Sequence, residues 1–384
     1  MGILEGVPGI TEDDCRLIRI LLANTSLQVQ FNGILTAPFV STIGSPQGDG
    51  LSPILFAIYL EAAIRELIAR GPQRPQCDLD IHLPLDAIYA DDTDFISLSD
   101  KFLDDVQNSV GPIFAEFDLL VNVDKTERTV VGHTDLVADQ SAWRKTRKLG
   151  SLLGVEEDVD RRIQLASQCF KSLDALWKHR ELVAQHIRIQ SYRAIVESVL
   201  LYNCGTWALT EALSDRIDRF QRKMLRRVIG LRLSDKVTNS DLYERCGIPA
   251  ASMQVINARW RLFGHVLRMD ENTPARKAMR YYFEKDQPGR QGNRVTIATA
   301  LSNEFKAATG KAISKYTEYE AVVSLAEDRE TWKQVVHNIT QVYHENKAVK
   351  VQRQTELRKE AKRKRELEQH TVVARVATCK RHKH

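Results

Sequence analysis

The sequence lacks the features that mark a membrane or secreted protein. Its longest unbroken apolar run, residues 54–60, is much shorter than the roughly 18 residues that a membrane-spanning helix needs. Residues 1–20 lack the basic-then-apolar layout of a secretory signal. The six cysteines are scattered, without a Cys-x-x-Cys pair, which argues against a disulfide framework. We therefore expect an intracellular protein with reduced thiols and no membrane crossing.

Charge is distributed unevenly along the chain, although 55 basic and 50 acidic side chains leave a net charge of only +5. Residues 1–140 have a net charge of −14, residues 141–346 of +10 and residues 347–384 of +9. An acidic block followed by a basic one suggests a metal-dependent site beside a polyanion-binding surface, because divalent cations screen carboxylates while Lys and Arg neutralise phosphates. The alternative interpretation is that these charged residues only form solvent-exposed faces and bind no ligand.

The spacing of apolar residues predicts an α+β chain with three regions. The first, residues 1–155, should combine helices and short strands. Its helices are expected at 13–24, 54–70 and 101–118, and its strands within 27–43 around Asn32-Gly33, and at 85–89, 94–98, 119–123 and 129–131. Long amphipathic helices are expected over 156–345. Residues 346–384 form a basic tail without a core-forming apolar stripe, helical or disordered.

The strongest chemical signal is the sequence Tyr-Ala-Asp-Asp at residues 89–92. Two short apolar runs flank it, which predicts a hairpin with Asp91 and Asp92 at its tip. Two carboxylates so close together are costly unless a divalent cation neutralises them, and phosphoryl transfer by two metal ions uses such ligands. Because Asp is also common in ordinary turns, the pair gains weight mainly from its context.

Two neighbouring segments supply that context. Residues 44–56 form a Gly/Pro/Ser-rich loop that enters a predicted helix, and glycine lets a backbone approach a substrate closely. Residues 122–127 (Asn-Val-Asp-Lys-Thr-Glu) offer Lys125 as a cation for a polyphosphate. In their order and spacing, the three segments resemble the palm domain of reverse transcriptases, specifically those of non-LTR (LINE-like) retrotransposons.

The resemblance implies a role for each matching residue. Asp91 and Asp92 match the family's Tyr-Ala-Asp-Asp box, which implies that they are catalytic ligands of Mg²⁺ or Mn²⁺. The same match implies that Tyr89 lies near the primer end and the nucleotide. Gln47 and Gly48 match the pair that lines the incoming nucleotide and the template base.

The segment that follows the hairpin resembles two further motifs of the family. The lysine of the first motif, here Lys125, lies near the triphosphate, and the resemblance extends to Asn122. Asp118 stands where that motif often has glycine, so a different turn is expected there. The Lys-Leu-Gly-Ser sequence at 148–151 resembles the family's primer grip.

The resemblance continues into the helical region. Segments 200–207, 259–269 and 326–332 look like stretches that follow the polymerase core in such elements. The helix over 215–230 resembles part of a thumb, which implies that its basic face contacts primer–template phosphates. The basic residues on that face are Arg219, Arg222, Lys223, Arg226 and Arg227.

One feature of the family is not found in this sequence. The family's first catalytic aspartate lies in a Phe-Asp strand motif several tens of residues before the Gln-Gly pair, and no such motif occurs before Gly44. We therefore expect a chain truncated at its N-terminus. The resemblance implies an RNA-directed DNA polymerase with an RNA template, a DNA primer and deoxynucleoside triphosphates as partners, inactive or impaired because one metal ligand is missing.

Other functions remain open. A non-catalytic nucleic-acid-binding remnant would keep the basic helices and tail without polymerising. A group II intron maturase or a telomerase fits less well, because the segments over 200–335 resemble neither. The basic run at 362–365 is consistent with nuclear import, with phosphate binding or with a plain solvated helix.

Overall fold

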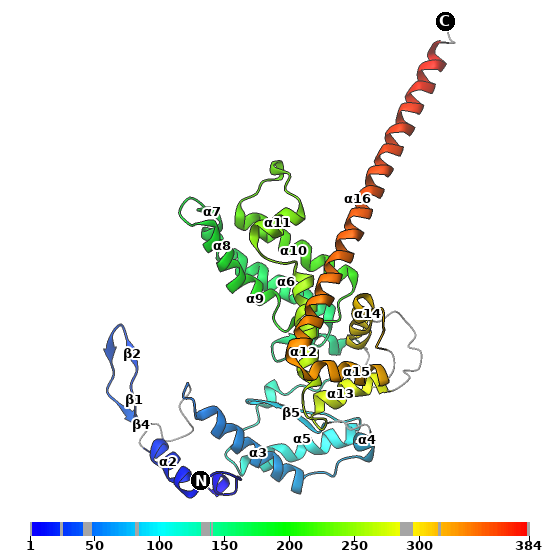
Figure 1. Ribbon diagram of the computed structural model, residues 1–384. Coiled ribbons are helices and arrows are strands. Elements are labelled where there is room, and N and C mark those ends of the chain that lie inside the picture. The colour runs from blue at the N-terminus through cyan, green and yellow to red at the C-terminus, as the bar shows by residue number, and fades with distance from the viewer. Residues whose placement is uncertain are drawn as a thin grey trace. The chain divides into compact units, whose positions relative to one another are not determined.

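The computed structural model describes residues 2–23, 26–40, 48–80, 84–131, 139, 141–284, 295–313 and 316–381. The chain forms two compact units, which are described separately: unit 1 is Met1–Arg128 and unit 2 is Thr129–His384 (Figure 1). The structure is mostly helical, with a few small two-stranded antiparallel sheets, and is compatible with the α+β class. No helix within the described ranges combines the length and the apolar character that crossing a bilayer requires.

Three of the five helices described in unit 1 lie where the sequence predicts helices: α2 (Glu12–Ala23), α3 (Ser52–Arg70) and α5 (Asp100–Ala115). Ser99 caps α5 by accepting a hydrogen bond from the backbone N–H of Phe102 (3.2 Å), and a proline in the first turn of α3 needs no hydrogen-bond partner there. Helices α3 and α5 pack together around a core that includes Ile64, Val106 and Phe114. The helices are α1 (Gly2–Glu5), α2 (Glu12–Ala23), α3 (Ser52–Arg70), α4 (Gln76–Asp80) and α5 (Asp100–Ala115).

Short antiparallel strand pairs accompany these helices. The turn between β2 and β3 is Asn32-Gly33, and both residues have positive φ (49° and 79°), as this dipeptide favours in tight hairpins. This turn is confirmed, and so is a hairpin around residues 89–92, but its second strand lies at Asp92–Phe95 rather than at 94–98 because Asp92 pairs with Tyr89. The pairs are β1 (Ser26–Leu27) with β4 (Phe39–Val40), β2 (Gln30–Phe31) with β3 (Ile34–Leu35), and β5 (Asp86–Tyr89) with β6 (Asp92–Phe95).

The strands predicted at 119–123 and 129–131 are wrong. Asn122 closes a turn by accepting a hydrogen bond from the backbone N–H of Lys125 (3.2 Å), so Val123–Lys125 forms the 3-10 helix η1. The other residues of the two segments belong to no strand. An extended segment becomes a strand only when a neighbouring strand pairs with its backbone, and the described chain provides none here.

The first part of unit 2 is a helical bundle with its own apolar core, as the amphipathic pattern predicts. Thr210 and Thr238 cap α10 and α11, while Gly230 and Gly247 end these helices with positive φ. The elements are η2 (Ala142–Lys145), β7 (Arg147–Lys148), β8 (Ser151–Leu152), α6 (Val155–Ser172), α7 (Asp174–Lys178), α8 (Gln185–Ser191), the π-helical η3 (Tyr192–Glu197), α9 (Ser198–Leu200), η4 (Cys204–Thr206), α10 (Glu211–Ile229), η5 (Leu233–Asp235) and α11 (Asn239–Cys246).

The second part of unit 2 is built around aromatic side chains. Trp260, Phe263 and Trp332 lie against one another, with ring centroids 5.6–6.0 Å apart. Gly264 permits this packing, because a Cβ atom there would lie only 2.0 Å from Nε1 of Trp332. The elements are α12 (Ala251–Leu267), α13 (Pro274–Glu284), α14 (Ile297–Thr309), α15 (Tyr316–Glu327) and α16 (Arg329–Arg381).

The limits of the units differ in two places from the regions read in the sequence. The units divide after Arg128, before the predicted boundary at residue 155. The β7–β8 hairpin belongs with unit 2, where the backbone N–H of Leu152 donates a hydrogen bond to Asp158 of α6 (2.9 Å). The predicted basic tail is not a separate segment, since it continues α16 as one helix to Arg381.

Candidate functional site

The β5–β6 hairpin carries the Tyr-Ala-Asp-Asp sequence at its closed end. Its ladder runs from Asp86 opposite Phe95 to Tyr89 opposite Asp92, so Ala90 and the following aspartate form a two-residue turn. Ala90 has a φ of +54°. This left-handed conformation costs an L-residue about 1–2 kcal/mol, and such strain is concentrated at functional sites.

A buried carboxylate fixes the chain that follows the hairpin. Asp78 of α4 is 0% exposed and accepts hydrogen bonds from Oγ of Ser97 (2.6 Å) and from the backbone N–H of Leu98 (2.9 Å). Oγ of Ser97 also accepts the backbone N–H of Ser99, which caps α5. The hairpin is therefore connected to α4 and α5 by a short polar network.

The side chains at the hairpin tip are exposed. Tyr89 is 67% exposed, and Asp91 and Asp92 are also in the exposed class. Within the described parts of the chain, neither carboxylate forms an ion pair with a Lys or Arg side chain. Both carboxylates are therefore accessible to a cation from solvent.

The donor set suits a hard divalent cation. Mg²⁺ is commonly bound by one or two carboxylates together with water and substrate phosphates, and Asp91 and Asp92 supply two adjacent carboxylates. Among the residues that the structure describes, no group of three or more His, Cys, Asp or Glu side chains could hold a metal ion. A metal ion at the hairpin tip would therefore have Asp91 and Asp92 as its described carboxylate ligands, and water or phosphate oxygens would supply the others.

The predicted nucleotide-binding residues other than Tyr89 lie outside the hairpin. Gln47 falls outside the described residues. Gly48 is exposed and has a φ of +96°, a conformation that favours glycine, shortly before α3 begins. Lys125 is exposed at the end of η1. In the described chain, no hydrogen bond or ion pair joins Gly48 or Lys125 to the tip.

Asp118 keeps the conformation that is usual for glycine. It follows α5 with a φ of +53°, and aspartate tolerates this region better than most residues do. The turn is held on α3, since the hydroxyl of Tyr59 donates to the carbonyl of Phe117 (2.8 Å). Aspartate in place of glycine therefore leaves a left-handed residue at this position.

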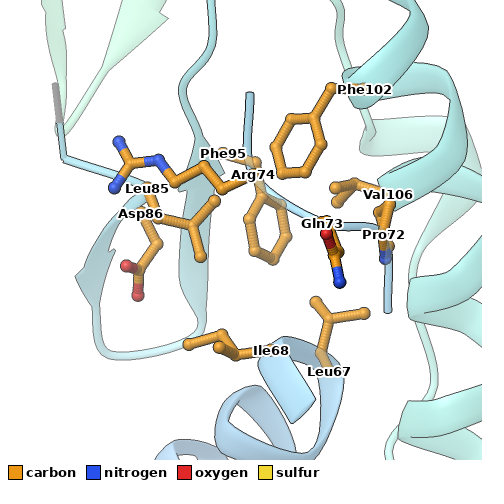
Figure 2. A pocket seen from close by; sticks show the side chains of 10 residues that line it. All are labelled: Leu67, Ile68, Pro72, Gln73, Arg74, Leu85, Asp86, Phe95, Phe102 and Val106. Atoms are coloured by element: carbon orange, nitrogen blue, oxygen red, sulfur yellow. The ribbon is translucent and has the colours of Figure 1, made fainter. Parts of the chain in front are cut away.

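A pocket of about 540 Å³ lies at the open end of the hairpin, opposite the tip (Figure 2). Its wall is mainly apolar, with Phe95 and Phe102 beside the polar side chains of Arg74 and Asp86. Burial raises the pKa of Asp86, and the negative charge of Glu61 raises it further. Asp86 was not predicted as a site residue from the sequence, although a carboxylate inside the apolar run at 85–89 was a usable signal.

The five predicted basic residues of α10 have two kinds of environment. Arg222 and Arg226 are half-buried and bond to α11 or the chain before it: Nη1 of Arg222 donates to the Tyr243 hydroxyl (3.4 Å), and Nη2 of Arg226 donates to Oδ1 of Asn239 (2.9 Å). These two arginines help to hold α11. The other three are exposed and available to a ligand: Arg219, Lys223 and Arg227.

The predicted primer-grip segment, residues 148–151, is fixed to the bundle by the next segment that resembles the family. The hydroxyl of Tyr202 donates to the carbonyl of Leu149 (2.9 Å), and Nδ2 of Asn203 donates to Oγ of Ser151 (3.2 Å). Two segments that are some 50 residues apart in sequence are therefore one structural element of unit 2.

The other two segments singled out in the sequence, 259–269 and 326–332, serve packing. Arg259 is 2% exposed, donates to the carbonyl of Trp207 (3.0 Å) and pairs with Glu304. Nε1 of Trp332 donates to the carbonyl of Trp260 (3.1 Å). The aromatic and basic residues of these segments therefore stabilise the fold of unit 2.

No protein-family model matches the chain, and no curated protein is significantly similar to it. Function is therefore inferred from the residues and their geometry.

Proposed function

We propose that this chain carries the metal-binding hairpin of a reverse-transcriptase palm and a helical, thumb-like region, and that it is an RNA-directed DNA polymerase of the non-LTR retrotransposon class whose activity is impaired. One observation carries the proposal: Tyr-Ala-Asp-Asp forms a tight hairpin whose turn is strained at Ala90 and whose two adjacent carboxylates are exposed. A plain solvated turn needs neither the strain nor the paired carboxylates.

Each residue of the proposed site has a definite task. Asp91 and Asp92 hold Mg²⁺, which when bound stabilises the negative charge of phosphoryl transfer. Tyr89 lies beside them and positions the primer end and the nucleotide. Residues 47–48 contact the nucleotide and the template base, and the ammonium group of Lys125 pairs with the triphosphate.

The distribution of charge supports a nucleic-acid substrate. Unit 1, which contains the carboxylate pair, has 20 acidic and 8 basic residues, whereas unit 2 has 30 acidic and 47 basic residues. Basic surfaces bind nucleic acid by replacing the counterions of the phosphates. In unit 2 the exposed residues Arg219, Lys223 and Arg227 of α10 supply such a surface.

Primer extension on an RNA template tests this function. The full chain is incubated with a labelled DNA primer on an RNA template, deoxynucleoside triphosphates and Mg²⁺ or Mn²⁺. Asp91→Ala is compared with Asp105→Ala, a matched control because Asp105 is also an exposed carboxylate of unit 1 but lies on α5. We expect the wild type to extend the primer slowly, because two of the family's three carboxylates are present. Extension should be lost in Asp91→Ala and kept in Asp105→Ala. Extension that persists in Asp91→Ala would refute the proposal.

A non-catalytic nucleic-acid-binding protein is the second candidate. It is favoured by Arg219 and Lys223, which are exposed and form no ion pair with any described residue. Fluorescence anisotropy of the labelled primer–template, measured on the same samples, separates the candidates. Binding without extension supports the second candidate, and the absence of both binding and extension rejects both.

A further inference from the structure

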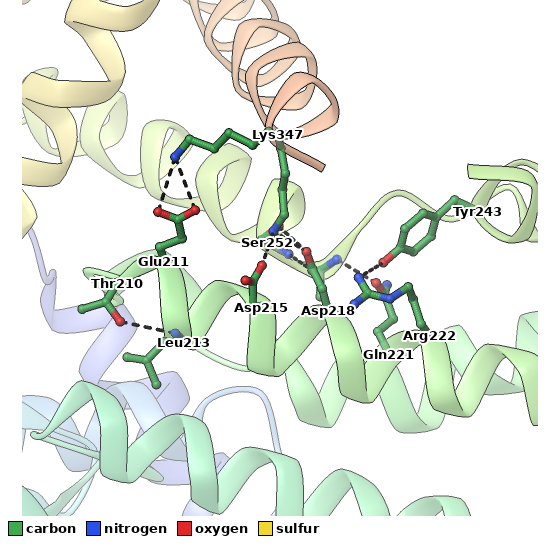
Figure 3. Close-up of polar contacts among 12 residues, drawn as sticks. Thr210, Glu211, Leu213, Asp215, Asp218, Gln221, Arg222, Tyr243, Ser252 and Lys347 are labelled. Carbon is green, nitrogen blue, oxygen red and sulfur yellow. Dashed lines mark hydrogen bonds and ion pairs between the residues drawn. The ribbon is translucent and has the colours of Figure 1, made fainter. Parts of the chain in front are cut away.

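Helix α16 has two halves with different surroundings. Its first half belongs to the core of unit 2, where Trp332, Val336 and Ile339 are at most 4% exposed. Two lysines then hold it beside α10. Nζ of Lys347 lies 2.6 Å from Oδ2 of Asp218 (Figure 3), and Lys350 pairs with Glu211 (3.4 Å).

The second half of α16 extends away from the rest of unit 2 (Figure 1). Every residue from 351 to 365 is exposed, and the helix continues to Arg381. At about 1.5 Å per residue, the helix beyond Lys350 is about 45 Å long. A helix that buries no apolar face is not stabilised by tertiary packing, so this part of α16 is available to a partner.

The composition of this segment restricts the partner. Residues 351–365 include seven basic and two acidic residues, and four of the basic residues are consecutive at 362–365. At 3.6 residues per turn the basic residues lie on all sides of the helix. Within residues 351–365, the apolar residues Val351, Leu357 and Ala361 form no continuous stripe. A membrane surface or a partner helix would require such a stripe.

We propose that the second half of α16, whose side chains at 351–365 are all exposed, is an arm that binds double-stranded DNA. The major groove of B-form DNA is wide enough to admit an α-helix, with phosphates of both strands along its edges. A helix that is basic on all sides can neutralise both edges at once, whereas the major groove of A-form RNA is too narrow for it. This proposal does not depend on polymerase activity, and it assigns the duplex to a surface separate from α10.

Anisotropy with a labelled DNA duplex tests the arm in the full chain, without metal or nucleotides. A duplex of about 25 base pairs is roughly twice as long as the arm, at about 3.4 Å per base pair. The arm variant combines Lys362→Gln, Arg363→Gln, Lys364→Gln and Arg365→Gln. The matched control removes the same charge from four exposed lysines of unit 2 outside α10 and α16: Lys171→Gln, Lys236→Gln, Lys306→Gln and Lys311→Gln.

The arm variant should bind duplex DNA at least about tenfold more weakly at roughly 0.1 M salt. The slope of log K against log salt should become shallower by about 3.6, because each of the four lost phosphate contacts removes about 0.9. The control should change both quantities much less. Lys362→Arg with Lys364→Arg should bind like the wild type, and circular dichroism should show equal helicity in all variants.

Three results would overturn the proposal. The first is an equal loss of DNA affinity in the arm and control variants, which would show that only the net charge of the chain matters. Unchanged DNA affinity in the arm variant would show that the arm makes no contact. Tighter binding to vesicles of phosphatidylcholine and phosphatidylserine than to the duplex, lost only in the arm variant, would assign the arm to a membrane. This binding assay does not depend on primer extension, so a chain that fails to extend a primer still tests the arm.

Discussion

Lys347 neutralises a buried carboxylate, so its removal should destabilise unit 2. Asp218 is 1% exposed, and its Oδ2 lies 2.6 Å from Nζ of Lys347, which is 22% exposed (Figure 3). Breaking a buried ion pair by removing one partner costs about 3–5 kcal/mol. Ser252 still donates two hydrogen bonds to Asp218, through its backbone N–H (2.9 Å) and Oγ (2.8 Å). We therefore expect Lys347→Met to cost about 3 kcal/mol, the lower end of that range.

Thermal and urea denaturation of the full chain measure this effect. For a unit of this size, about 3 kcal/mol corresponds to a fall in Tm of roughly 6–12 °C. Adding Asp218→Asn to Lys347→Met should restore part of the loss, because no buried charge is left without a partner. Lys350→Met is the control, since Lys350 pairs with an exposed Glu211 and should change stability little. The reasoning fails if Lys347→Met behaves like Lys350→Met, or if the double variant recovers nothing.

The same pair makes stability depend on alkaline pH. Burial alone lowers the pKa of Lys347, but the attraction of Asp218, Tyr343 and Asp215 outweighs it, so the pKa is raised above its ordinary value of 10.5. A raised pKa means that the folded chain holds the proton more tightly than the unfolded chain does. The stabilisation is therefore complete below pH 10.5 and is lost as the pH rises through the folded-state pKa. Lys347→Met should lack this alkaline loss.

Three further predictions concern packing, strain and burial. Gly264→Ala should lower the free energy of unfolding by about 1–3 kcal/mol in urea denaturation, because the new methyl group collides with Trp332. Gly2→Ala is the control and should be neutral or stabilising, because Gly2 is an exposed residue of α1 where the methyl group meets nothing within 4 Å. Ala90→Gly should raise the stability of unit 1 by about 0.5–1 kcal/mol by relieving its positive φ; a loss of stability would show that the turn is not strained. Burial raises the pKa of Glu197 above its ordinary value of 4.5. The wild type should therefore lose stability relative to Glu197→Gln in denaturation curves as the pH rises from about 4.5 through the folded-state pKa, and an unchanged difference would contradict this.

Short sequence patterns correctly predicted the turns and helices whose conformation depends mainly on neighbouring residues. The Asn32-Gly33 turn requires two positive φ angles, which these residues adopt easily. The apolar stripe of α10 follows from helical periodicity, and the turn between β5 and β6 from two apolar runs around a polar pair. The position of Asp91 and Asp92 at a hairpin tip was predictable for the same reason.

Contacts between distant segments were not predictable. The sequence does not reveal that Asp158 accepts a hydrogen bond from Nε1 of Trp207 (2.9 Å), or that Arg222 and Arg226 bond to α11 and the chain before it rather than facing a ligand. Strand formation at 119–123 also depended on a pairing partner, which apolar alternation cannot establish. The positive φ of Ala90 could not be read from its residue type, since alanine disfavours that conformation.

A titration with Mn²⁺, followed by electron paramagnetic resonance of the free ion, tests most directly whether Asp91 and Asp92 together hold a divalent cation. The wild-type chain and Asp105→Asn should bind one more equivalent of Mn²⁺ than the Asp91→Asn/Asp92→Asn variant does, and excess Mg²⁺ should displace it. Equal binding by the wild type and the double variant would contradict the claim that these two carboxylates form a metal site.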